Sequence, residues 1–376
     1  MSNQARERTS LDASELEGPE ELSRHRLRSR VLFAAGLALV VVALVTLLPG
    51  LSSLRSRLAH ADPAWLVLGV ALKLASGLGY VVVFRMIFCR RMSWRVSYQI
   101  GMSELGANAL FPTGGAGGLA LGAWALKRGG MQGREIARRT VAFFLLTSVP
   151  NVLGVIVLGI ALAIGVFAGE SNLLLTALPA AIAAGAIVAT LAAGRAAERG
   201  GDRVKARAGR APSRRMKALW HGLNALAGGV RESVILLREG NLLLVAGLIG
   251  YLVFDVLILW AGFRALGQAP SLAVLSLAYL IGELGGLIPV PGGIGGVDAG
   301  LVGTLALYHV PLTAAVGAVL AYRAIALWVP AVAGGTAFVW LKRTLRDEAD
   351  ALAVCVPERE MDVIGLGRVV VRGEPH

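Results

Sequence analysis

The residues of this sequence with the most capacity for chemistry are charged side chains inside its long apolar runs. Away from the polar tails and loops, two bases and four acids occupy such positions: Lys73, Glu104, Asp255, Glu283, Asp298 and Arg323. A charge at the centre of a bilayer costs about 2.5–3.5 kcal/mol even on a lenient scale, so each group is a functional candidate. Arg323 is the strongest candidate for holding an anion, because a guanidinium stays charged when buried and its planar fork suits a phosphate.

These groups also have structural alternatives. Lys73 and Asp255 could form a buried pair that only locks the helices together. Arg323 could be the internal partner of Asp298 or of Glu283 rather than a ligand for phosphate. Lys73 and Asp255 each lie in the apolar run that precedes a glycine-rich segment, which is compatible with both roles.

Two glycine-rich segments interrupt the apolar runs 97–126 and 272–308. The first extends from Pro112 to Gly118 and the second from Pro289 to Gly296. Proline and glycine break a helix, and the N-terminus of the next one offers unpaired N–H groups to an anion. Close helix packing through small residues is the alternative. The predicted phosphate contacts here are Gly114, Gly115, Gly117, Gly118, Gly292, Gly293, Gly295 and Gly296, with Asn108 and Tyr322 as further substrate-binding candidates.

The two glycine-rich segments are copies of one another. Each follows Glu-Leu-Gly, at 104–106 and at 283–285, and each carries Gly-Gly-x-Gly-Gly after a proline. The offset between the copies is 179 residues before the break and 178 after it. Glu104 and Glu283 are therefore equivalent positions, where a carboxyl could exchange protons or could only cap a half-helix.

The composition places these segments in a membrane. The 376 residues are 56% hydrophobic and 16% charged, with a mean hydropathy of +0.67, whereas a soluble domain carries about 25% charged residues. High apolar content excludes disorder, and two cysteines exclude a disulfide scaffold. We therefore predict an all-α polytopic membrane protein with apolar runs at 31–50, 64–84, 97–126, 140–168, 172–194, 241–262, 272–308 and 312–341.

The net charge of +13 lies almost wholly between these runs. The segment 195–240 holds eleven basic residues against four acids, and 85–95 and 127–139 are also basic. The positive-inside rule places all three in the cytoplasm. Basic residues placed between membrane spans set the topology and do not indicate nucleic acid. Segments that bind nucleic acid also carry aromatic residues for base stacking, and Trp220 is the only aromatic residue in the large basic loop. We therefore exclude nucleic acid as a partner.

This topology requires the run 97–126 to enter the membrane and return to the same side. We therefore expect about six full spans and two re-entrant hairpins, the second entering from the other side, as an inverted-topology repeat. Eight plain spans with kinks are the alternative. Inverted repeats with broken helices are typical of alternating-access transporters. The expected units are a polar tail 1–30, a transmembrane domain 31–341 and a tail 342–376, with repeat halves at about 64–168 and 241–341 joined through 172–194 and 195–240.

Part of the basic loop has helical character. Apolar residues recur at near-helical spacing within it: Leu219, Trp220, Leu223, Leu226 and Val230. This pattern predicts an amphipathic helix on the anionic inner leaflet. A solvated linker is the alternative.

The second glycine-rich segment and its surroundings resemble a known family. Residues 291–300, the pair Tyr322-Arg323 and the stretch from Trp328 to Pro330 resemble the flippase-like membrane domain of lysylphosphatidylglycerol synthases and their stand-alone relatives. The resemblance covers roughly 30–342. It implies movement of lipids with charged or polyprenyl-phosphate heads between leaflets. The sequence departs from the family in having Asp298 where many members have Glu.

We therefore expect a lipid transporter in a bacterial-type plasma membrane, with both termini cytoplasmic. Its expected substrate is an anionic phospholipid or a polyprenyl-phosphate lipid, held by Arg323, Lys73 and the glycine turns. The acids would line a polar cavity or exchange protons: Glu104, Glu283, Asp298 and Asp255. The alternatives are a non-transporting scaffold or regulatory subunit of envelope synthesis, or a membrane-embedded lipid phosphatase or transferase. No catalytic motif or metal-ligand spacing occurs, so we expect no enzyme activity, metal or cofactor.

Overall fold

The computed structural model describes residues 59–110, 116–164, 214–267, 269–285 and 295–347, besides a few isolated helical positions. These residues form helices and short connections, and no strand, which confirms the prediction of an all-helical protein. The predicted spans 31–50 and 172–194 and the tail 1–30 lie outside these ranges. The predicted tail 342–376 begins inside the last turns of α13, which extends to Asp347, and its remainder lies outside the described residues. The helices are α4 (Pro63–Phe88), α5 (Trp94–Leu110), α6 (Ala116–Arg128), α7 (Gly133–Ala163), α9 (Arg214–Arg238), α10 (Leu242–Ala265), α11 (Leu272–Gly285), α12 (Gly296–Leu307) and α13 (Leu312–Asp347).

Four of these helices, α4, α7, α10 and α13, are long and apolar enough to cross a membrane. Their ends follow local sequence signals. The Asp62 side chain accepts a hydrogen bond from the Ala64 N–H, and Pro63 occupies the first helical position of α4. The Asn241 side chain caps α10 in the same way through Leu243. The apolar pattern thus predicted these long helices correctly.

The two apolar runs with glycine-rich segments are broken, as predicted. The first run gives α5 and α6, and the second gives α11 and α12. Gly117, Gly118 and Gly296 lie in the first turn of the helix that follows each break rather than in the turn itself, which corrects their predicted placement. Gly295 alone of the described glycines here has a left-handed backbone, with φ of +95°. Gly114, Gly115, Gly292 and Gly293 lie outside the described residues.

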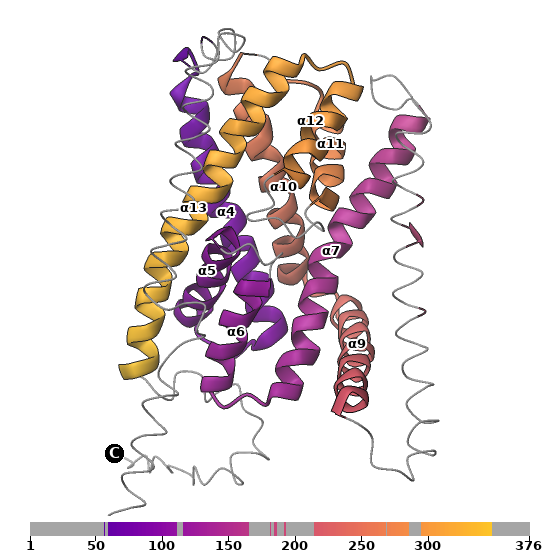
Figure 1. Cartoon of the computed structure of the whole chain (residues 1–376). Coiled ribbons are helices and arrows are strands. Elements are labelled where there is room, and N and C mark those ends of the chain that lie inside the picture. Colours follow the sequence, from indigo (N-terminus) through magenta and orange to yellow (C-terminus); the bar gives the residue numbers. More distant parts are fainter. Residues whose placement is uncertain are drawn as a thin grey trace, which may run out of the picture.

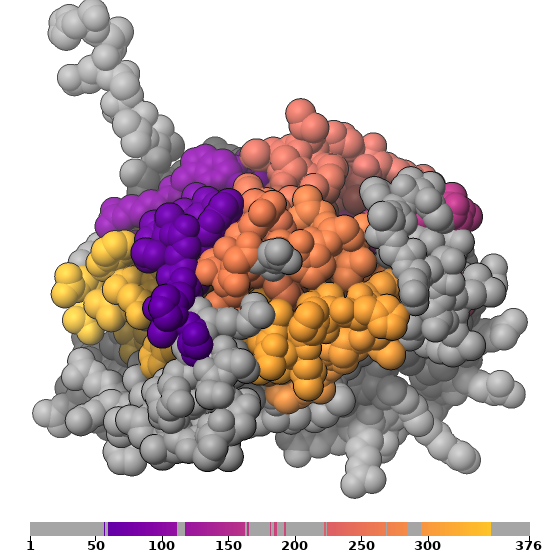
Figure 2. All heavy atoms as spheres, turned by 90° about the horizontal axis from the view of Figure 1, so that it is seen from above, coloured from indigo at the N-terminus to yellow at the C-terminus, as the bar shows by residue number. Residues whose placement is uncertain are grey.

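The short helix pairs lie at opposite ends of the bundle (Figure 1). The α5–α6 pair lies at the end that carries the basic segments 85–95 and 127–139, which we call the basic end. The α11–α12 pair lies at the other end, and Figure 2 shows these orange helices in the middle of that face. Long helices α4 and α10 pack together, α5 packs on α13, and α11 packs on α7.

Small residues bring each short pair against its long helix. A Cβ atom on Gly106 of α5 would lie 2.8 Å from the Gly334 Cα of α13. A Cβ atom on Gly154 of α7 would lie 2.9 Å from the Leu280 Cδ1 of α11. Gly154 and Gly334 each stand four residues after a proline inside their long helix. The two ends of the bundle are therefore built alike.

Aromatic and basic side chains gather near both ends of the long helices. At one end Trp65 packs edge-on against Trp260, which Arg264 also contacts. At the basic end the Arg85 guanidinium lies 4.3 Å from the ring centre of Trp94. Large apolar side chains between the ends are exposed, among them Val67, Leu78, Val157, Ile249 and Val332. Such a surface, apolar in the middle and aromatic at both rims, is that of a membrane protein.

The predicted amphipathic helix in the basic segment exists as α9. It packs against α7, because Gly228 and Gly229 allow it to approach Arg138 and Val141 closely. Residues 214–238 are therefore a packed helix and not a solvated linker. Its predicted contact with an anionic leaflet stays a prediction.

Candidate functional site

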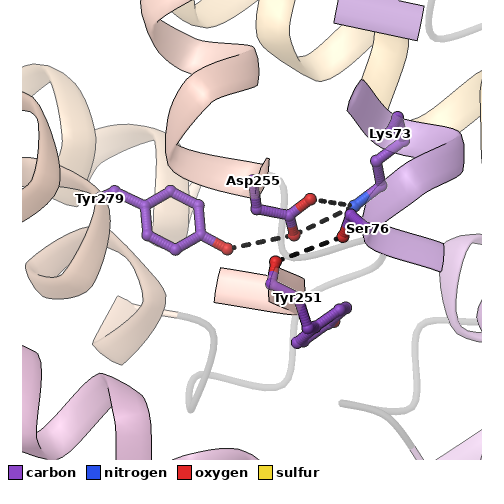
Figure 3. A network of polar contacts seen from close by, with 5 residues as sticks. All are labelled: Lys73, Ser76, Tyr251, Asp255 and Tyr279. Carbon is purple, nitrogen blue, oxygen red and sulfur yellow. Dashed lines mark hydrogen bonds and ion pairs between the residues drawn. The ribbon is translucent and has the colours of Figure 1, made fainter. Parts of the chain in front are cut away.

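The centre of the protein contains a buried ion pair between Lys73 of α4 and Asp255 of α10 (Figure 3). The Lys73 Nζ lies 2.8 Å from Oδ1 and 3.1 Å from Oδ2 of Asp255. Both residues are buried, with 8% and 3% of their surfaces exposed. The two helices also approach closely further along, at Gly79 and Gly247, where a Cβ on Gly79 would lie 3.0 Å from the Gly247 carbonyl oxygen. The pairing of Lys73 with Asp255, an alternative left open by the sequence, is what the structure contains.

Hydroxyl groups extend this pair into a network. The Tyr279 hydroxyl of α11 donates to Asp255 Oδ2 at 3.3 Å, so the second broken helix pair contacts the ion pair directly. The Ser76 hydroxyl donates to the backbone oxygen of Tyr251 at 3.3 Å. Figure 3 shows these side chains converging from α4, α10 and α11. We call Lys73, Ser76, Tyr251, Asp255 and Tyr279 the central network.

Glu104 of α5 lies in a second buried polar contact. The Tyr80 hydroxyl of α4 donates to Glu104 Oε2 at 2.8 Å, and Glu104 is 1% exposed. The carboxyl occupies space that α6 leaves free, because a Cβ on Gly122 would lie 1.6 Å from Glu104 Oε1. No residue with a side chain fits at this position without displacing the carboxyl. Gly122 therefore has a specific role that its place in a glycine-rich motif only suggests.

Aromatic rings connect the two polar groups. The rings of Tyr80 and Tyr251 are 5.7 Å apart between centres, and those of Tyr279 and Tyr322 are 6.2 Å apart. The first contact links Tyr80, beside Glu104, to Tyr251 of the central network, and the second links Tyr279 of that network to Tyr322 on α13. Tyr322 lies beside the central network as a packed aromatic residue.

Arg323 of α13 forms an ion pair with Asp298 of α12, one of the two partners that the sequence suggested for it. The Arg323 Nε lies 2.5 Å from Asp298 Oδ1, and Asp298 Oδ2 accepts a hydrogen bond from the Gly295 N–H at 3.0 Å. Asp298 thus closes the N-terminus of α12 and neutralises Arg323 at once. The two side chains keep 23% and 25% of their surfaces exposed, unlike the central pair.

Glu283 and Asn108 are two further site residues that the sequence suggested. Glu283 of α11 interacts electrostatically with Asp255, Arg323 and Lys73, so it belongs to the same charged region. Asn108 has a structural contact instead. Its Oδ1 accepts a hydrogen bond from the Gly118 N–H at 2.8 Å, so the side chain caps α6 from the end of α5. This contact ties the two helices across the break.

The structure therefore joins most of the predicted charged residues in one region, with acids in excess of bases. Sequence reasoning missed the tyrosines that connect them, Tyr80, Tyr251 and Tyr279. They could have been found as hydroxyl-bearing side chains inside apolar runs, but a census of charges alone passes over them. Within the described ranges, no group of three or more His, Cys, Asp or Glu side chains could hold a metal ion.

Comparison with known proteins agrees with this architecture. A segment of the chain is 29% identical over 94 residues to the UPF0104 membrane protein MJ1595 of Methanocaldococcus jannaschii. The match covers 25% of this chain and 28% of that protein. The profile of the family described as the lysylphosphatidylglycerol synthase TM region matches residues 33–334. The matched region includes both broken helix pairs and the central network, and the chain belongs to this family of membrane proteins.

Proposed function

We propose that this protein transports a lipid with an anionic, phosphate-bearing head group between the two leaflets of a membrane. The observation that carries the proposal is the Arg323–Asp298 pair, which lies where α12 begins after the second break and remains partly exposed. A phosphate could replace the Asp298 carboxylate on the guanidinium fork while the helix N-terminus adds its positive end. An anionic phospholipid and a polyprenyl-phosphate lipid both offer that group.

The central pair has a different role in this proposal. Lys73 is too deeply buried to exchange its partner for a lipid head without a large opening between α4 and α10. We assign it to holding these two helices together, so that Arg323 is the residue that meets the phosphate. This assignment changes the expected role of Lys73 from a ligand to a structural group.

In this proposal, the balance of charge at the site couples binding of the lipid head group to uptake of protons. The six candidate groups are two bases and four acids, of which Arg323 and Asp298 are partly exposed, so an added phosphate meets excess negative charge if every acid is ionised. Protonation of Glu104 or Glu283 would relieve that repulsion. Uptake of an anionic head group would then be accompanied by proton uptake.

The proposed architecture is an inverted repeat of two re-entrant hairpins, α5–α6 and α11–α12, with the basic end and both termini in the cytoplasm. Their positions at opposite ends of the bundle and the similar packing of each on a long helix support it. Cysteines placed at residues 95 and 128 should react with an impermeant reagent from the same side of the membrane. Labelling from opposite sides would make the first pair a full span and remove the inverted repeat.

Transport itself is tested in liposomes with head-group-labelled phosphatidylglycerol, a polyprenyl phosphate and phosphatidylcholine. We expect faster exchange of an anionic lipid than of phosphatidylcholine, and a loss of that preference in Arg323→Lys, which keeps the charge but not the fork. Arg264→Lys is the matched control, since Arg264 is an exposed arginine at the end of α10. Exchange no faster than in empty liposomes would favour a non-transporting scaffold.

A further inference from the structure

A second site lies at the basic end, on the outside of the bundle. A cavity of about 390 Å³ opens there between α5 and α13, lined by Arg95, Tyr98, Gln99 and Trp340. Its volume falls in the range of small-ligand sites. Arg95, Tyr98 and Gln99 are spaced three and four residues apart in the first turns of α5, so they share one helix face.

Three of the four lining residues offer groups that suit a lipid head group. Arg95 supplies a positive charge at the N-terminal end of α5, where the helix dipole also favours an anion. Trp340 is half exposed and lies near the basic end of α13, the level at which aromatic rings meet lipid head groups. The mouth of the cavity therefore has the chemistry to accept a phosphate beside an aromatic ring.

One of the lining side chains, Gln99, carries an unsatisfied acceptor. Gln99 is 2% exposed, and its Oε1 has no hydrogen-bond partner within the described part of the chain. A buried polar atom without a partner is unfavourable, and native structures rarely keep one without a reason. A ligand that reaches this oxygen with an O–H or N–H group would satisfy it.

We propose that this cavity binds the head group of a membrane glycerophospholipid that carries a hydrogen-bond donor beyond its phosphate. The phosphate lies at Arg95, and the donor, a hydroxyl or an ammonium group, lies at Gln99 Oε1. The acyl chains remain in the bilayer beside Trp340. This site is separate from the central network, and the proposal does not rest on transport.

Binding is measured on the purified full chain by native mass spectrometry, with dioleoyl phosphatidylglycerol, phosphatidylethanolamine and phosphatidylcholine titrated separately. Arg95→Gln should weaken phosphatidylglycerol binding by about 10-fold, the loss of a charge-assisted contact. Gln99→Leu should weaken the two donor-bearing lipids by about 3- to 5-fold and leave phosphatidylcholine unchanged. Whichever of the two donor-bearing lipids binds more tightly identifies the donor.

Arg91→Gln is the matched control, because Arg91 is an exposed arginine four residues earlier that does not line the cavity. Equal losses in Arg91→Gln and Arg95→Gln would reduce the effect to general surface charge and overturn the site. Equal sensitivity of all three lipids to Gln99→Leu would overturn the role of the buried acceptor. Arg95 is exposed, so its substitution tests the site even if the Gln99 variant folds poorly.

Discussion

The two ion pairs of this protein should respond very differently to the loss of their bases. Lys73→Met leaves the Asp255 carboxylate buried, with the Tyr279 hydroxyl, 3.3 Å away, as its remaining hydrogen-bond donor among the described side chains. Removal of one member of a buried pair costs about 3–5 kcal/mol, because the remaining charge is neither paired nor hydrated. The same truncation, Arg323→Met, should cost only about 1 kcal/mol, since Asp298 is a quarter exposed and keeps its bond from Gly295.

A double-mutant cycle separates charge from packing in the central pair. Lys73→Met with Asp255→Leu replaces both charges by apolar groups of similar size, an exchange that is often neutral or stabilising. The double variant should therefore recover most of the stability that Lys73→Met loses. Free energies of unfolding are measured by denaturant titration of the purified protein in mixed micelles.

Two results would refute this reasoning. If Lys73→Met loses no more stability than Arg323→Met, the depth of burial of the Lys73–Asp255 pair does not govern its contribution. If the double variant is as unstable as Lys73→Met alone, the loss comes from packing around the lysine stem and not from a stranded carboxylate.

Three further outcomes are expected. Gly334→Ala should weaken the α5–α13 contact, because the new Cβ would lie 2.4 Å from a backbone oxygen of α5. The control is Gly335→Ala, whose Cβ meets nothing within 4 Å, and thermal unfolding of the two variants is compared. Gly122→Ala should displace the Glu104 carboxyl and lower stability more than Gly335→Ala does in the same measurement. Liposome transport of an anionic lipid should accelerate as pH falls, and Glu283→Gln should reduce that dependence; a rate that is independent of pH would contradict proton coupling.

Much of the fold could be predicted from the sequence because hydropathy sets the long helices and glycine with proline sets the breaks. The run 241–262 became α10 with ends shifted by only a few residues. Other boundaries shifted further, as at α7, which begins at Gly133 among charged residues and not at the start of its apolar run. The charge census also singled out Lys73 and Asp255, which the structure buries and pairs with each other.

The sequence does not determine which partners the candidate side chains contact. Whether Arg323 meets Asp298 or Glu283 depends on how α12 is rotated against α13, and no periodicity specifies that rotation. Asn108 looked like a ligand because it precedes a glycine turn, yet its amide caps α6 across the break. This hydrogen bond joins residues ten positions apart on two different helices, and hydropathy does not encode such a contact.

The packing of α5 on α13 has a consequence for the order in which the chain is built. Gly106 and Gly334 meet in the finished protein, but the ribosome makes them far apart in time. At about 5–20 residues per second, the interval between their synthesis is roughly 10–50 s. During that interval α5, with Glu104 and Gln99 on it, is in the membrane without its principal helix neighbour. Helix α13 therefore completes the packing of the first half of the protein, and a chain truncated before α13 should leave α5 open to membrane quality-control proteases.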